Sequence, residues 1–159
     1  MRMSDTPLEF APLAGAVRGG LCAVGDDWWT MLGEAFAEAG TPLVSLWGSD
    51  RRDLGEGFVV YAAFAADDGL ACARLPLASD PPEYPDLAEL FPAAGRMQRA
   101  LFDLLGVRAR GAIDRRPWLR HGGWPEDYFP LRNGADGGRS FDIEQEHYEF
   151  VAVAGDGVH

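Results

Sequence analysis

The sequence contains no lysine, two cysteines and three histidines, and each scarcity excludes a class of protein. Cys22 and Cys72 are too few and too far apart for a four-cysteine iron–sulfur cluster or a cysteine-rich zinc site. We expect both as small buried residues in strands. The histidines, at positions 121, 147 and 159, lack metal-ligand spacing. We therefore expect no metal or other cofactor.

Long apolar runs are also missing. No segment approaches the roughly 18 apolar residues that a membrane-spanning helix needs. The N-terminus has no contiguous apolar core of the signal-peptide type. A G-x-G-x-x-G fingerprint for a dinucleotide, following a strand, is not found either. These features predict a cytoplasmic protein that does not bind a nucleotide through this motif.

Positive charge is scarce as well, since 25 acidic residues stand against 14 arginines and the net charge is −11. This balance argues against nucleic acid and anionic membrane surfaces as general partners. Codon bias explains the use of arginine in place of lysine, but it does not explain why the arginines cluster. Residues 96–120 hold seven arginines and two aspartates, a net charge of +5, which leaves −16 elsewhere.

The rest of the composition, 47% hydrophobic and 25% charged, is typical of one globular domain with a real core. Residues 26–39 have helical spacing, with Trp29, Leu32 and Phe36 on one apolar face. Asp26 or Asp27 is expected to cap this helix at its start. Gly40 stands where a C-terminal cap belongs.

Strands are expected over residues 42–50, 55–67 and 70–78, with a short one near 21–24 and a last one over 147–155. One or two helical turns over 86–91 and a helix from Pro92 to Gly106 should follow the proline-rich residues 79–86. Within that helix Arg99 and Asp103 stand four apart and are expected to pair. The predicted fold is α+β: a small, mostly antiparallel or mixed sheet with helices on one face, then a long extended C-terminal arm.

Residues 107–140 form this arm, which shows neither helical nor strand periodicity. Its central part, GAIDRRPWLRHGGWPEDYFPLR (111–132), is rich in tryptophan, arginine and proline. Disordered segments are poor in aromatic residues, so disorder does not fit. Two interpretations stay open: the arm wraps its own domain with its aromatic side chains, or it docks on a second protein through them.

Residues 91–132 resemble the signature region of the 30-kDa subunit family of respiratory complex I (NADH–quinone oxidoreductase). The similarity is strongest to the version in group 4 membrane-bound nickel–iron hydrogenases, of the formate hydrogenlyase type, with the pattern G-A-x-D-x-R-P-W-L-x-H-G-x-W-P and then F-P-L-R. Quinone-enzyme members carry Glu-Arg-Glu-x-x-Asp and Gly-His-Pro-Asp instead. Here those positions read Gln98, Arg99, Ala100 and Asp103, and Gly111, Ala112, Ile113 and Asp114. These departures favour the hydrogenase type.

The resemblance implies a non-catalytic assembly subunit of a membrane-associated electron-transfer complex, held on the inner face of the membrane by its partners. Those partners would be a 49-kDa-type or hydrogenase-like large subunit and a small iron–sulfur subunit. Residues 1–106 would be the scaffold domain, 107–140 the docking arm, and 141–159 a strand and junction. The end, YEFVAVAGDGVH, resembles the junction at which fused relatives continue into a large-subunit domain, so an N-terminal domain of a fused protein is the alternative.

The partner-binding residues expected on this basis come from the second helix and the arm: Arg99, Asp103, Asp114, Arg115, Arg116, Trp118, His121, Trp124 and Arg132. The arginines beside Asp114 would form ion pairs, partly across the interface, and the two tryptophans would fill pockets. For His121 a structural role is favoured over one near a partner's active site.

Three other classes of function are less consistent with the sequence. A free-standing enzyme could use Asp103, Asp114 or His121 as acid–base groups, but no nucleophile is placed beside them. An RNA-binding module is suggested by arginines between tryptophans, and the negative remainder of the chain opposes it. The third alternative is a stand-alone protein-binding module, which would use the same arm but bind a partner outside an electron-transfer complex.

Overall fold

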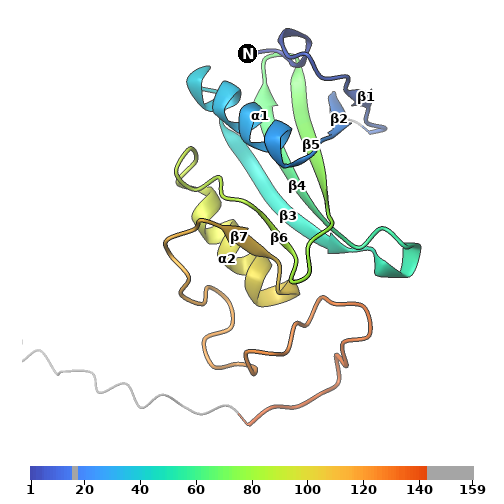
Figure 1. The fold of residues 1–159 in the computed structure, drawn as a ribbon, viewed down its shortest axis with the longest axis vertical. Coiled ribbons are helices and arrows are strands. Elements are labelled where there is room, and N and C mark those ends of the chain that lie inside the picture. Colours follow the sequence, from blue (N-terminus) through green and yellow to red (C-terminus); the bar gives the residue numbers. More distant parts are fainter. Residues whose placement is uncertain (16–17, 143–159) are drawn as a thin grey trace, which may run out of the picture.

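The computed structural model describes residues 1–15 and 18–142 (Figure 1). The helices are α1 (Asp26–Glu38) and α2 (Ala94–Leu105), with short 3-10 turns η1 (Met3–Asp5) and η2 (Arg52–Leu54). The strands are β1 (Ala11–Pro12), β2 (Gly19–Ala23), β3 (Leu43–Asp50), β4 (Phe58–Ala66), β5 (Gly69–Leu77), β6 (Glu83–Pro85) and β7 (Arg108–Arg110). The α+β class that the sequence predicts is confirmed.

Five of these strands form one mixed sheet in the order β1-β2-β5-β4-β3. Strands β3, β4 and β5 pair antiparallel, as the expected meander requires. Strand β2 joins β5 in parallel, and β1 closes that edge antiparallel to β2. Strand β3 is thus left as the other edge of the sheet, next to α2.

Both helices cover the same face of this sheet (Figure 1). Along β4, alternate residues Phe58, Val60 and Phe64 point into the hydrophobic core between sheet and helices. Phe36 of α1 stacks on Phe64 with ring centroids 4.6 Å apart. Strand β3 approaches α2 so closely that a Cβ on Gly48 would lie 2.5 Å from a methyl carbon of Leu101. The predicted arrangement of helices on one face is therefore confirmed.

Helix α1 ends as its sequence predicts but begins differently. Gly40 adopts a φ of 68°, its N–H donates to the Ala37 carbonyl at 3.0 Å, and the Thr41 N–H donates to the Phe36 carbonyl at 2.8 Å. This pair of bonds is a Schellman motif, which needs the left-handed conformation that glycine adopts without strain. At the start, Gly25 is the N-cap. Asp26 and Asp27 lie in the first turn, where the helix dipole stabilises a negative carboxylate.

Residues 86–91 form one helical turn, closed by the Phe91 N–H on the Leu87 carbonyl at 2.8 Å, within the one or two turns expected. Two other expectations differ from the structure. The proline-rich stretch contains β6, which pairs in parallel with β7. Strand β7 lies at the start of the arm, where no regular structure was expected. Burial of Ala109 in the core holds this stretch in place beside β6.

The two cysteines are buried in strands, Cys22 in β2 and Cys72 in β5, as predicted. Burial raises the pKa of Cys22 from 9.0 to about 11, so this thiol stays protonated and unreactive near neutral pH. The strand expected over residues 147–155 lies outside the described residues. The division of the chain at residues 106 and 140 stays a prediction.

Candidate docking surface

After β7, residues 111–142 contain no assigned helix or strand. They run along the C-terminal end of α2, at the end of the molecule opposite the N-terminus (Figure 1). Irregular backbone cannot satisfy its own polar groups through regular pairing, so other groups must hold it in place. In the described part of the arm, three sets of contacts with the globular part, here called anchors, hold the backbone in place.

The first anchor is the carboxylate of Asp103 in α2, a side chain that is only 3% exposed. One of its oxygens, Oδ2, accepts the backbone N–H groups of Trp118 at 2.7 Å, Leu119 at 2.7 Å and Arg120 at 3.2 Å. Three successive amides that converge on one charged oxygen fix the backbone locally. The expected surface pair between Arg99 and Asp103 is wrong, because this carboxylate faces its own arm.

The second anchor closes the C-terminal end of α2. The Arg132 Nε donates to the Leu105 carbonyl at 2.7 Å, and the Leu131 N–H donates to the Leu104 carbonyl at 3.0 Å. The last carbonyls of a helix have no partner within the helix, so these bonds satisfy them. The Arg132 guanidinium also lies over the Phe129 ring, 4.2 Å from its centroid. Burial lowers the pKa of Arg132 from its ordinary value.

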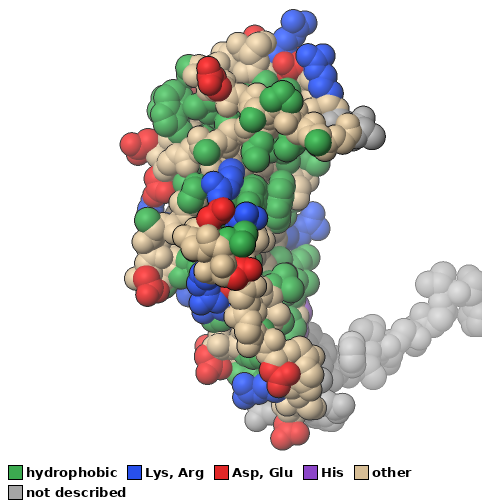
Figure 2. All heavy atoms as spheres, turned by 90° about the vertical axis from the view of Figure 1, so that its right-hand side faces the viewer, with side chains coloured by type: hydrophobic (Ala, Val, Ile, Leu, Met, Phe, Trp, Pro, Cys, Tyr) green, Lys and Arg blue, Asp and Glu red, His purple; other side chains and the backbone are tan. Residues whose placement is uncertain are grey.

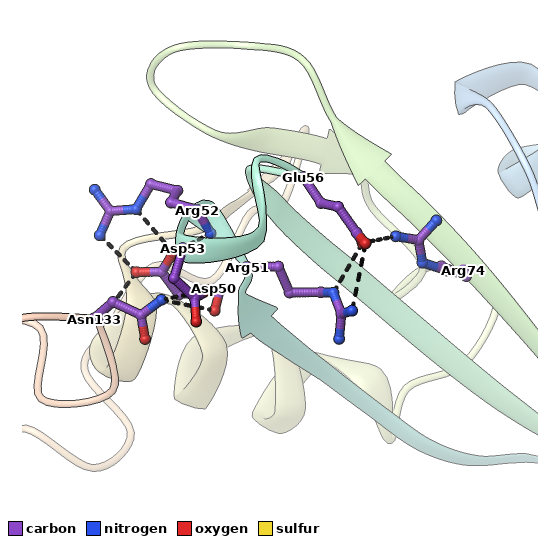
Figure 3. Close-up of polar contacts among 7 residues, drawn as sticks. All are labelled: Asp50, Arg51, Arg52, Asp53, Glu56, Arg74 and Asn133. Carbon is purple, nitrogen blue, oxygen red and sulfur yellow. Dashed lines mark hydrogen bonds and ion pairs between the residues drawn. The ribbon is translucent and has the colours of Figure 1, made fainter.

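The third anchor joins the arm to the end of β3 (Figure 3). The Asn133 N–H donates to Asp50 Oδ2 at 2.8 Å, and its side-chain amide donates to the Asp50 carbonyl and to Asp53 Oδ1. The guanidinium of Arg52 also binds Asp50, whose side chain is 1% exposed. The hydrogen bond from Arg52 lowers the pKa of Asp50 from 3.8 to about 2. Sequence reasoning missed this anchor, because Asp50 and Asn133 are 83 residues apart.

Four of the predicted residues come together on the surface beside α2. The Asp114 carboxylate binds Arg116 at 2.8 Å and Arg99 at 3.3 Å. The Arg99 guanidinium lies over the Trp118 ring, 4.8 Å from its centroid. Hydrogen bonds from Arg116 hold the pKa of Asp114 well below its usual range. This cluster is thus a charged and aromatic patch with fixed geometry.

The remaining predicted residues are more scattered. Arg115 Nε donates to the Ala112 carbonyl at 3.3 Å. His121 is exposed in a turn with a φ of 33°, and no metal-ligand group of three or more His, Cys, Asp or Glu occurs among the described residues. Trp124 is half-buried, and its indole Nε1 finds no hydrogen-bond partner in residues 1–15 and 18–142. Among residues 1–15 and 18–142 the His121 side chain makes no hydrogen bond or ion pair.

Although its backbone is anchored, the arm leaves large apolar side chains in solvent: Ile113, Trp118, Leu119 and Leu131. Trp118 is 38% exposed and Ile113 is 88% exposed. The arm therefore contacts its own domain through backbone groups and through the side chains of Arg132 and Asn133, while these four apolar side chains stay partly or largely exposed.

Positive and negative side chains are mixed on at least one side of the molecule. On the side shown in Figure 2, acidic, basic and hydrophobic side chains are interspersed. The arginine cluster between residues 96 and 120 is thus a local feature. Across the residues that the structure describes, no helix is both long and apolar enough to cross a membrane.

Comparisons with known proteins agree with these features. Residues 26–140 match the family described as "Respiratory-chain NADH dehydrogenase, 30 Kd subunit". Formate hydrogenlyase subunit 5 of Escherichia coli (strain K12) is 30% identical over 122 residues, which cover 70% of this chain and 21% of that protein. Hydrogenase-4 component G of the same organism is 31% identical over 93 residues, 57% of this chain and 17% of that protein. The chain thus spans about a fifth of the length of these relatives.

Two solved structures share the fold. A trypsin-resistant fragment of Nqo5 superimposes with a TM-score of 0.57 and 18% identity, over 70% of this chain and 90% of the fragment. A chain of the membrane-bound sulfane sulfur reductase, an archaeal respiratory membrane complex, superimposes with a TM-score of 0.67 and 19% identity. That match covers 92% of this chain and 94% of the other.

Proposed function

Because the chain belongs to the family of the 30-kDa subunit of respiratory-chain NADH dehydrogenase, in its group 4 hydrogenase version, we propose that it is a non-catalytic assembly part of a membrane-associated electron-transfer complex. It docks through its arm on a hydrogenase-like or 49-kDa-type large subunit, beside a small iron–sulfur subunit. It reaches the inner face of the membrane through that complex.

One observation carries this proposal. The arm is tied to the globular part by backbone contacts to Asp103, while the side chains of Trp118, Leu119 and Ile113 stay 38%, 44% and 88% exposed. An arm whose only task was to seal its own domain would bury these side chains. A rigid backbone that presents exposed tryptophan beside arginine has the composition of an interface hot spot.

The arginines and Asp114 contribute charge and orientation. Arg99 and Arg116 are both paired with Asp114 at the surface, so a partner meets a preorganised array. Such an array adds little to the stability of the isolated chain, because exposed ion pairs contribute at most about 1 kcal/mol. At an interface the same groups select the partner and its orientation. His121 and Trp124 would lie at the edge of this contact.

The same docking surface applies if this region is the N-terminal domain of a longer, fused protein. In the Escherichia coli relatives this region is about a fifth of a longer chain, whereas in the archaeal respiratory complex the matched chain is almost fully covered. In a fused protein the arm would dock on a large-subunit domain of the same polypeptide. The expected junction over residues 141–159 belongs to this arrangement.

The test replaces Trp118 with alanine and measures how much large subunit co-purifies from the native host. Loss of an aromatic anchor at an interface costs roughly 2 kcal/mol or more, so most of the large subunit should be lost on washing. Trp28→Ala is the matched control, because Trp28 is 39% exposed on α1, against 38% for Trp118. Unchanged retention with a folded Trp118→Ala variant, or equal loss with Trp28→Ala, would count against docking through the arm.

A further inference from the structure

A small cavity lies between α2, β7 and the start of the arm, with a volume of about 30 Å³. Its wall contains four arginines and two aspartates, together with Gln98 and the Phe102 ring. The charged residues are Arg99, Arg108, Arg115, Arg116, Asp103 and Asp114. The volume is roughly what one or two water molecules need, so the cavity admits one small group and excludes a nucleotide or a quinone ring.

The charges in this wall do not balance. The buried oxygen of Asp103 is already occupied by three backbone N–H groups, and Asp114 is shared by Arg99 and Arg116. Arg108 and Arg115 are bound to no carboxylate among residues 1–15 and 18–142. Two positive charges therefore face the cavity without an acidic partner in the described structure.

Arg108 is also held in place. Its guanidinium lies over the Phe102 ring, 4.3 Å from the centroid, and its backbone is paired with β6 in the small parallel sheet. Stacking on a ring leaves the edge of the planar guanidinium free to donate two parallel hydrogen bonds. This geometry matches a carboxylate, which accepts two such bonds at once.

We propose that this cavity receives a single carboxylate side chain, aspartate or glutamate, from the large subunit. The inference rests on the proposed function and adds which kind of side chain of the large subunit makes the contact. A partner that is acidic around this contact is repelled by the rest of the chain, which carries −16, and attracted by the +5 of residues 96–120. The pocket thereby fixes where and in which orientation the partner docks.

The absence of lysine allows a direct test. In an Arg108→Lys variant the only lysine amine of the chain stands in the cavity. A water-soluble carbodiimide, applied to the intact complex from host membranes, couples an amine only to a carboxylate in direct contact with it. We expect an amide between the new amine at position 108 and an aspartate or glutamate of the large subunit, identified by mass spectrometry of the digested complex.

Arg110→Lys is the matched control, because Arg110 lies two residues away and binds Asp26 of its own chain at 2.7 Å. It should couple to Asp26 within the chain. Suppose that the large subunit co-purifies, but that position 108 couples only to its own chain, or to nothing while the Arg110→Lys control couples. The proposed carboxylate pocket is then wrong, while the proposed docking on the large subunit is not. If the large subunit does not co-purify with the unmodified chain, the proposed function itself is wrong, and the pocket with it.

A second measurement does not depend on coupling chemistry. Arg108→Gln removes the charge, and truncating one partner of a desolvated charge pair costs at least about 2 kcal/mol, which lowers the affinity for the large subunit roughly thirtyfold or more. Arg110→Gln removes the same charge from the same strand and should retain the large subunit. Equal retention by the two variants overturns the pocket.

Discussion

Single carboxylates decide where the arm lies, and Asp103 is the clearest case. It is buried, and its partners are three backbone amides of the arm rather than an arginine. A charged acceptor in such a site stabilises a backbone path that no helix or sheet would support. The exposed positions of Trp118 and Leu119 follow from this one side chain.

Replacement of Asp103 by alanine should therefore lower the free energy of unfolding by about 1–3 kcal/mol, because three partly buried N–H groups lose their acceptor. Urea unfolding followed by tryptophan fluorescence measures this loss. Asp127→Ala is the control, since Asp127 is an exposed acid of the same arm. A loss of the same size in both variants would show that the carboxylate of Asp103 has no special role.

Asp50 makes the stability of the fold depend on pH. Hydrogen bonding from Arg52 lowers its pKa from 3.8 to about 2, so the folded state favours the ionised form. The stabilisation is complete above about pH 4 and is lost as the pH falls through about 2. The difference in urea midpoint between the native chain and Asp50→Asn should thus be constant near neutral pH and shrink between these values. A difference that does not vary with pH would contradict the assignment.

At the level of elements, the β4–β5 hairpin depends on a glycine. Gly69 has a φ of 136°, and a Cβ there would collide with the carbonyl of Arg18, the residue directly before β2. The parallel pairing of β2 with β5 begins at this point, with Gly19 opposite Leu70. Glycine is therefore needed both for the turn and for the approach of the N-terminal strand.

Gly69→Ala should destabilise the protein by roughly 3 kcal/mol, the sum of backbone strain and a clash with backbone atoms that cannot move away. Gly55→Ala separates the two effects, because Gly55 has a φ of 73° but no atom within 4 Å of a Cβ. That control should cost only the strain, roughly 1 kcal/mol. Thermal unfolding of both variants gives the comparison, and equal losses would exclude the clash with Arg18.

On the scale of the whole molecule, the arm and the scaffold are not separable at residue 106 without cost. Val107 and Ala109 are buried with the main core, and β7 supplies the second strand of the small sheet. The first residues of the arm thus complete the hydrophobic core of the scaffold. The buried side chains of Val107 and Ala109 thus serve the core, whereas the side chain of Arg108 between them lines the cavity proposed for the partner's carboxylate.

Two truncations test this division. A chain that ends at Ala112 keeps β7 and should unfold cooperatively, with a lower midpoint because the three anchors of the arm are gone. A chain that ends at Gly106 also loses two buried core residues and a strand, which should cost several kcal/mol more and remove the cooperative transition. Circular dichroism during heating distinguishes them, and identical melting curves would support a scaffold that ends at residue 106.

Much of the fold could be predicted because its signals are local. The alternation over residues 58–66, the helical spacing around Trp29 and the glycine at position 40 each lie within one element. The sequence left open whether the sheet is antiparallel or mixed, since nothing in residues 19–23 indicates that β2 pairs with β5 in parallel. Strands β6 and β7 were missed because three residues are too few for a periodic signal.

The sequence by itself determined the helices, the meander and, through the long motif of residues 91–132, the family, since each is encoded by residues close together in the chain. Tertiary structure alone decided which groups meet: Asp103 with the amides of the arm, Asn133 with Asp50, and four arginines around one small cavity. These contacts join residues many positions apart. Their geometry depends on how α2 packs on the sheet, and no local pattern of residues records that.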